Sequence, residues 1–149
     1  DDTEIVNNGY DWYKNMWNSI GITKELFSKK FCILQWFPYP SKNFHNDFVN
    51  KKLNTHIMQL ESHKFIVKLA RYAISQGKTV IAMRSVHNWE DVLKPSAIEN
   101  DQEDYGLNYS KNYEDNFYFS MDNLNNSLKK KNITKPLKVK INYSSILEK

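Results

Sequence analysis

The sequence contains few of the residues on which several common kinds of site depend. Its 149 residues include one cysteine, Cys32, and four glycines. A single cysteine excludes a disulfide within the chain, and its place in an apolar run predicts a buried, inert thiol in a reducing compartment rather than a nucleophile. Four glycines, without GxGxxG or GxxxxGKS/T spacing, argue against a glycine-rich phosphate loop.

The four histidines do not have the spacing of a metal site. His45, His56, His63 and His87 show no ligand pattern with one another or with Cys32, so we expect no metal and no cofactor. His56 and His63 lie seven residues apart and can share a helix face as solvated or core residues. No apolar run approaches the ~18 residues that span a bilayer, and no signal-peptide pattern is present. These absences predict a soluble, cytoplasmic protein without a membrane partner.

Apolar and aromatic residues are plentiful enough for one folded domain. Hydrophobic residues make up 40% of the chain and aromatic residues 14%, which predicts a single α/β domain over residues 1–149 rather than disorder. The net charge of +4 permits an anionic partner without requiring one. Because the chain starts at Asp1 without a methionine, we expect it to be a processed or excerpted piece.

The first half of the chain predicts a helix, a strand and a second helix. An apolar stripe of Tyr13, Met16, Trp17 and Ile20, followed by Gly21, predicts the first helix. The continuous apolar run Phe31–Phe37 predicts a strand covered on both faces, as in parallel sheets. A long helix is expected over Leu60–Gln76, ended by Gly77. Its expected buried face consists of Ile66, Leu69, Ala70, Ala73 and Ile74.

The second half predicts further strands of the same sheet. The apolar run Thr79–Met83 predicts a strand, and with the preceding strand and helix it forms a right-handed βαβ unit. A short helix should follow and end at Pro95, before a polar, acidic and exposed excursion over residues 99–115. A third strand is expected at 116–120, then a helix capped by Ser120 or Asp122.

The tail and the element order define the expected fold class. Residues 137–143 alternate apolar side chains with lysine and asparagine, which predicts a half-solvated edge strand. We therefore expect an α/β fold, a three-layer sandwich around a mostly parallel sheet. The sheet should be incomplete at the N-terminal side and should carry a C-terminal edge strand.

Polar, cationic and aromatic side chains follow the carboxyl end of each predicted strand. In open parallel sheets, ligands bind just outside these ends. Lysine and arginine suit phosphates, aromatic rings stack on bases, and asparagine amides read base edges, so the pattern predicts a DNA or nucleotide ligand. The predicted binding residues are Pro38, Tyr39, Ser41 and Lys42 after the first strand, Arg84, Ser85 and Trp89 after the second, and Asn123 and Asn125 after the third.

Each of these residues also has an ordinary structural explanation. Pro38 and Pro40 can simply stiffen a turn, and Arg84 can pair with an acid of the 99–115 segment. Trp89 can belong to the core, and the asparagines can cap a helix. The coincidence of such residues at three successive strand ends favours the binding interpretation.

The motifs resemble a branch of the uracil-DNA glycosylase superfamily. Members of that branch have a strand that ends in Phe-Pro-Tyr-His-Ser-Lys and a later strand that ends in Met-Arg-Ser, similar to "FPYPSKNF" and "AISQGKTVIAMRSVHNW". "YDWYKNMW" resembles the aromatic helix before these motifs, and "NFYFSMDNLNNS" resembles the last motif. The resemblance covers residues 10–127 and implies an enzyme that extrudes a nucleotide and cleaves its base–sugar bond.

The resemblance implies binding roles for the matched residues. Ser41 and Lys42 would meet backbone phosphate, Arg84 and Ser85 would line the pocket rim, and residues 123–127 would press on the duplex. Pro40 stands where the branch usually has histidine. The turn that positions the hydrolytic water in the superfamily precedes every matched motif. The chain therefore resembles the carboxyl-terminal part of such a domain, with its catalytic residue unknown and supplied by a missing N-terminal segment or another chain.

A non-enzymatic interaction module is the competing hypothesis. Eight acids and two lysines fall between Glu90 and Asp115, whereas Lys129–Lys140 holds six lysines and no acid. The acidic 99–115 loop and the basic 129–140 tail could together contact a protein partner, or both could be solvated surfaces.

Overall fold

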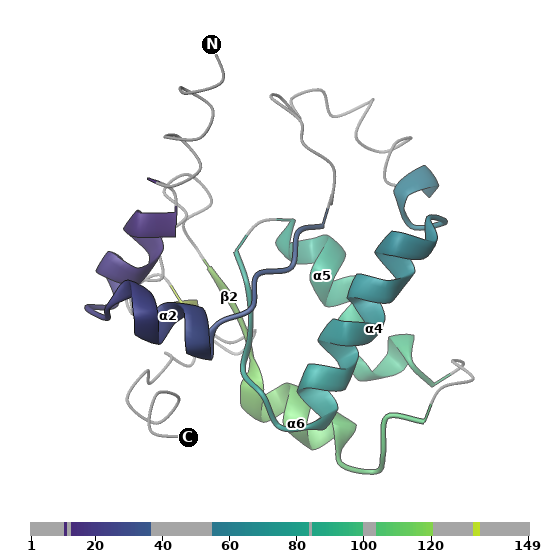
Figure 1. Cartoon of the computed structure of the whole chain (residues 1–149). Coiled ribbons are helices and arrows are strands. Elements are labelled where there is room, and N and C mark those ends of the chain that lie inside the picture. The colour runs from purple at the N-terminus through teal and green to yellow at the C-terminus, as the bar shows by residue number, and fades with distance from the viewer. Residues whose placement is uncertain are drawn as a thin grey trace.

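The computed structural model describes residues 11, 13–36, 55–83, 85–99, 104–120 and 133–134. Figure 1 shows helices α4 (Glu61–Ser75), α5 (Val86–Leu93) and α6 (Tyr109–Asn116) gathered together, while α2 (Lys24–Lys30) lies apart from them. None of the described helices is long and apolar enough to cross a membrane.

The first predicted helix is confirmed. Residues 13–19 are helical, and Met16 and Trp17 of the expected stripe are buried. Gly21 follows with a φ of 72°, a left-handed conformation that glycine adopts without steric cost. Trp17 packs against Phe27 of α2, with 5.9 Å between ring centroids. The two short helices are therefore held together by aromatic packing.

The long helix α4 is also confirmed, with a somewhat different buried face. Gly77, with a φ of 67°, follows its end as predicted. Leu69 was expected to be buried, but it is 37% exposed. The face that packs against α5 and α6 follows the spacing i, i+4, i+7 and i+11, and it includes a histidine and an arginine. The buried residues of α4 are His63, Val67, Ala70, Arg71 and Ile74.

The described sheet has three short strands in the order β1-β2-β3. β1 and β2 are parallel, with Val80 opposite Phe117, and β3 pairs antiparallel with β2. The chain passes from β1 to β2 through α5, a 3-10 turn and α6, so this is a strand–helix–strand crossover. The predicted strands at 79–83 and 116–120 are confirmed, as is the short helix before Pro95. Their bounds are Val80–Ala82 for β1, Phe117–Ser120 for β2, Ile133–Thr134 for β3 and Pro95–Ala97 for the 3-10 turn η1.

The predicted strand Phe31–Phe37 is not a strand of this sheet. Its described part, residues 31–36, has no regular secondary structure, because a strand requires a hydrogen-bonded neighbour and none is present among the described residues. The predicted βαβ unit that starts from this strand is therefore not formed in the described sheet. Cys32 was expected to be buried and is instead exposed.

The expected exposed excursion over residues 99–115 is wrong for its second half, which forms α6. Tyr109 and Tyr113, one helical turn apart, give this otherwise polar segment a buried stripe. The hydroxyl of Tyr109 donates to the carbonyl oxygen of Leu93 at 2.7 Å. Burial raises the pKa of Tyr109, so its hydroxyl stays protonated and able to donate. Glu114 and Asp115 are exposed.

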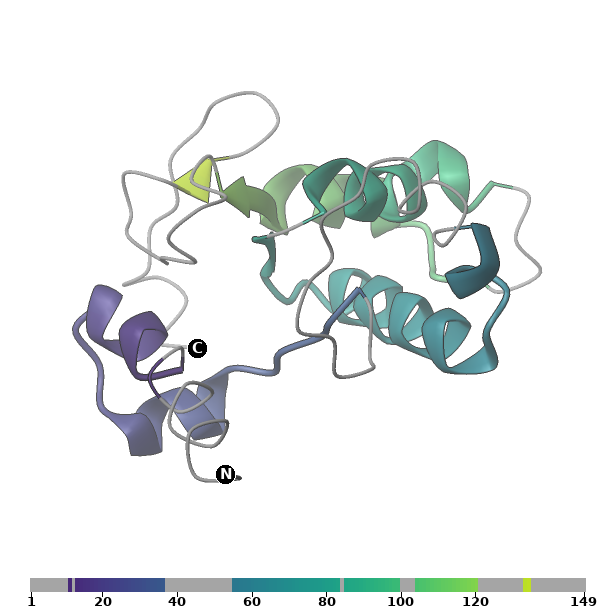
Figure 2. The ribbon, with the colours of Figure 1, turned by 90° about the horizontal axis from the view of Figure 1, so that it is seen from above.

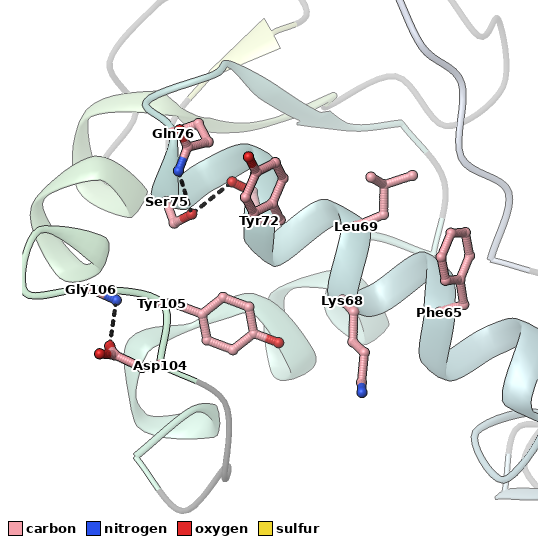
Figure 3. A pocket seen from close by; sticks show the side chains of 9 residues that line it. All are labelled: Phe65, Lys68, Leu69, Tyr72, Ser75, Gln76, Asp104, Tyr105 and Gly106. Carbon is pink, nitrogen blue, oxygen red and sulfur yellow. Dashed lines mark hydrogen bonds between the residues drawn. The ribbon is translucent and has the colours of Figure 1, made fainter.

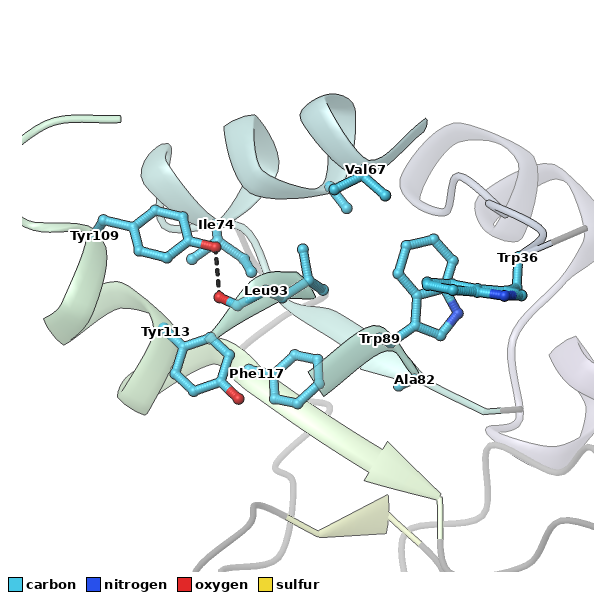
Figure 4. Close-up of a cluster of buried hydrophobic side chains, with 10 residues drawn as sticks. Trp36, Val67, Ile74, Ala82, Trp89, Leu93, Tyr109, Tyr113 and Phe117 are labelled. Carbon is cyan, nitrogen blue, oxygen red and sulfur yellow. Dashed lines mark hydrogen bonds between the residues drawn. The ribbon is translucent and has the colours of Figure 1, made fainter. Parts of the chain in front are cut away.

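Two hydrophobic clusters lie on opposite faces of β1. We call the first the core cluster: it joins β1 and β2 to α4, α5 and α6, with Phe117 and Leu93 fully buried (Figure 4). The second, the N-terminal cluster, contains Met16, Trp17, Phe27 and Ile133. Along β1, Val80 and Ala82 contact the first cluster, whereas Ile81 and Met83 contact the second. This alternation is that of a strand buried on both faces, in a mixed α/β fold with a small sheet.

The expected C-terminal edge strand at 137–143, and the helix expected after Ser120, lie outside the described residues. The antiparallel strand that the structure does describe is β3, a few residues earlier in the chain. It pairs with β2 through Phe119 and Ser120.

Candidate nucleic-acid interface at the carboxyl ends of β1 and β2

The carboxyl ends of β1 and β2 leave the sheet at the same edge. The two strands are parallel neighbours, and Ala82 near the end of one lies opposite Phe119 near the end of the other. The last described residues of the two strands therefore lie close together at one edge of the sheet. Two of the three predicted binding segments follow these strand ends in the sequence.

Of the nine predicted binding residues, the structure describes Ser85 and Trp89. Those that lie outside the described residues are Pro38, Tyr39, Ser41, Lys42, Arg84, Asn123 and Asn125.

Ser85 forms the junction between β1 and α5. It is exposed and has a φ of 49° and a ψ of 40°, a left-handed conformation that costs a non-glycine residue about 1–2 kcal/mol. Helix α5 starts at the next residue, Val86. The Ser85 side chain does not cap the first turn of α5, and within the described part of the chain the N–H groups of this turn are available to an acceptor. Helix N-termini of this kind favour anions.

Trp89 lies in the core, which was the alternative interpretation of this residue. It is 7% exposed, and its ring meets Trp36 edge-on, with centroids 5.0 Å apart (Figure 4). A ring buried in this way cannot stack on a ligand. The contact has a positional consequence, because Trp36 directly precedes the predicted binding segment 37–42. The described stretch that ends at Trp36 therefore ends beside α5, the helix that follows β1.

His63 is a polar member of this aromatic group that sequence reasoning did not select. Its ring meets that of Trp36 edge-on with centroids 4.4 Å apart, and it is 2% exposed. Its buried Nε2 has no hydrogen-bond partner among the described residues. Desolvation lowers the pKa of His63 from its ordinary value of 6.5. His63 precedes Val67, Ala70 and Ile74 by four, seven and eleven residues, and this helical spacing was the sequence signal for its place on the buried face of α4. His56, by contrast, is exposed.

We expect His63 to make the protein less stable in mild acid. Because the folded-state pKa lies below the unfolded value of 6.5, the neutral ring contributes its full stability above pH 6.5. That contribution is lost as the pH falls below 6.5 toward the folded pKa, by at most about 1.4 kcal/mol per pH unit. Urea unfolding between pH 7.5 and 5 should show this slope, and His63→Leu should reduce it.

His56→Gln is the matched control for this measurement, since His56 is exposed and should leave the slope unchanged. An identical slope in the native protein and in His63→Leu would contradict the assignment.

A hollow lies between α4 and residues 104–106. It has a volume of about 580 Å³, and three aromatic rings line it, from Phe65, Tyr72 and Tyr105 (Figure 3). Phe65 and Tyr72 are 64% and 58% exposed, respectively. The carboxylate of Asp104 accepts a 2.7 Å hydrogen bond from the Gly106 N–H, which shapes the loop. Sequence reasoning missed this groove because it depends on the packing of residues 104–106 against α4, two segments that are distant in the sequence.

No metal site is visible in the described part of the chain. It contains no group of three or more histidine, cysteine or carboxylate side chains close enough to hold an ion. The acids Asp101 and Glu103 lie outside the described ranges.

Comparisons with known proteins found no match. No protein-family model, no curated protein and no solved structure matches it. The resemblance to uracil-DNA glycosylases therefore stays a prediction from the motifs, and the function has to be inferred from the chain's own residues.

Proposed function

We propose that the chain is a nucleic-acid- or nucleotide-binding α/β domain whose ligand lies across the carboxyl edge of β1 and β2. The observation that carries this proposal is the parallel pairing of those two strands, which brings their carboxyl ends to one edge of the sheet. We assign to this edge the Met-Arg-Ser and Asn-containing segments, which follow the two strands in the sequence. Ligands of open parallel sheets bind at this edge. The uncapped first turn of α5, directly after Ser85, adds a preference for a negatively charged group.

Each proposed contact follows from the chemistry of its side chain. Lys42 and Arg84 bind backbone phosphates, and Ser41 and Ser85 donate hydrogen bonds to them. Tyr39, held between Pro38 and Pro40, stacks on a base. The amides of Asn123 and Asn125 read base edges. Trp89 is assigned a different role from the one predicted: through Trp36, it supports the start of the 37–42 segment from the core.

The proposed architecture is a three-layer sandwich around a mostly parallel sheet. The core cluster and the N-terminal cluster contact alternate residues of β1, which supports helices on both faces of the strand layer. If the likeness to uracil-DNA glycosylases extends to activity, the protein is a base-excising hydrolase. Its catalytic residue then lies outside the matched motifs, so binding is the activity we assign to this chain.

Fluorescence anisotropy with labelled single- and double-stranded oligonucleotides tests the proposal. We expect binding at low salt that weakens as salt rises, because phosphate contacts release counterions. Lys42→Ala and Arg84→Ala should each weaken binding roughly 5- to 10-fold, about 1–1.4 kcal/mol, and reduce the slope of log K against log salt by about 0.7–0.9.

Lys29→Ala is the matched control, because Lys29 is exposed in the last turn of α2 and is not among the proposed contacts. The proposal fails if no oligonucleotide binds at low salt, or if the control weakens binding as much as the two test variants.

Protein interaction is the second candidate function, and one specific observation favours it. The groove between α4 and residues 104–106 exposes Phe65, Leu69 and Tyr72 along one stripe of α4. Large exposed aromatic side chains are typical of interaction surfaces. This surface adjoins the acidic 99–115 segment of the competing hypothesis through Asp104.

A further inference from the structure

β1 has the sequence of a central strand but lies at the edge of the described sheet. Its residues Val80, Ile81 and Ala82 carry no charge, and none is a proline. Its only strand partner in the described sheet is β2. Natural edge strands are usually protected by lysine, proline or a bulge, because their open backbone groups recruit other strands. An unprotected apolar edge of this kind is the pattern of a strand with neighbours on both sides.

Residues 31–36 also have the sequence of a strand, but they have no partner strand in the described sheet. The backbone groups of Cys32, Ile33, Leu34 and Gln35 make no hydrogen bond to another described residue. Their side chains nevertheless alternate as in a strand, with Leu34 in the core cluster and Ile33 in the N-terminal cluster. Unpaired backbone groups in an apolar segment are costly, so such groups normally find a partner.

The two segments belong to one layer of the molecule. Residues 31–36 and β1 both contribute alternate side chains to the same two clusters. Figure 2 shows residues 31–36 on the opposite side of β1 from β2, and the two segments are not paired with each other. The open backbone edge of β1 is therefore the edge away from β2, on the side where residues 31–36 lie.

We propose that the position between residues 31–36 and β1 accepts a β-strand from a partner polypeptide, which hydrogen-bonds to both. Because both neighbours contact hydrophobic clusters on each face, the inserted strand must be apolar on both faces, rich in β-branched residues and free of proline. The strand-like tail of the chain itself does not meet this requirement, since Lys138 and Lys140 would be buried there. This mode of recognition is strand addition, with affinity supplied by main-chain hydrogen bonds.

Selection from a random dodecapeptide library displayed on phage, with the whole 149-residue chain as target, tests the proposal. We expect enrichment of peptides with a run of apolar, β-branched residues. The synthetic form of an enriched peptide should slow amide hydrogen exchange at least 10-fold both within residues 32–35 and in β1. A version N-methylated at every residue of the apolar run keeps the side chains but loses the backbone donors on both edges of the strand, and it should give no protection.

Four outcomes would overturn the inference. The amides of residues 32–35 could already be protected in the free chain, or the enriched peptides could be charged. The N-methylated peptide could protect as well as the parent. Protection of the free chain that rises with protein concentration would show that a second copy fills the position. None of these outcomes depends on whether the chain binds nucleic acid.

Discussion

Phe117→Ala should cost about 3–5 kcal/mol of unfolding free energy, a large part of the 5–15 kcal/mol typical of a domain. Phe117 is fully buried in β2, opposite Val80 of β1, and its ring stacks on that of Tyr113 with centroids 4.8 Å apart. Truncation removes apolar contacts with the core cluster and leaves a cavity between the sheet and α6. Urea unfolding followed by tryptophan fluorescence measures the loss.

Phe65→Ala is the matched control, because the same substitution is made at a side chain that is 64% exposed. Its unfolding free energy should stay within about 0.5 kcal/mol of the native value. If Phe117→Ala lost no more stability than Phe65→Ala, the described packing of β2 would be wrong.

Arg71→Met should lower the unfolding free energy by about 2–3 kcal/mol, because Arg71 connects α4 to two other parts of the chain. Its Nε donates to the carbonyl oxygen of Val92 in α5 at 2.9 Å, and its guanidinium lies 5.8 Å from the ring centroid of Tyr105. Methionine keeps much of the volume but leaves that carbonyl without this donor, a loss of about 1–3 kcal/mol. It also removes a cation–π contact worth about 0.5–2 kcal/mol. Urea unfolding measures the sum.

Lys68→Met separates this effect from the general loss of a positive charge, because Lys68 is exposed on the same helix. A double-mutant cycle of Arg71→Met with Tyr105→Leu should give a coupling of about 0.5–2 kcal/mol. An Arg71→Met protein as stable as the native one would mean that burying the guanidinium costs as much as its contacts contribute.

Local sequence patterns were sufficient to predict most of the helices. Helix α4 ends at a left-handed glycine and α5 ends before Pro95, and both signals act over a few residues of chain. α6 was missed because its two core tyrosines stand among polar residues, and only packing against Leu93 and Phe117 makes their spacing meaningful.

The candidate site was also predicted only in part. Apolar runs in the sequence predicted where β1 and β2 end. Their parallel pairing is the arrangement that a site at the carboxyl ends of both strands requires. Whether Trp89 stacks on a ligand or joins the core could not be decided from its neighbours in sequence. The decision came from Trp36, 53 positions earlier in the chain, which covers its ring. The sequence likewise left open whether His63 is solvated or belongs to the core, because its ring contacts Trp36, which is distant in the sequence.

The sequence by itself determined the helix at residues 13–19, the helices α4 and α5, and which segments are apolar enough to form strands. Those properties arise from side-chain spacing and from backbone preferences that act locally. Only the tertiary structure decided which strands pair, because a strand requires hydrogen bonds from residues distant in sequence. Residues 31–36 have the local features of a strand, yet the backbone groups of residues 32–35 make no hydrogen bond to another described residue. Likewise, β1 has the composition of a central strand but lies at the edge of the described sheet. Strand pairing is a property of two segments, so no single segment could reveal it.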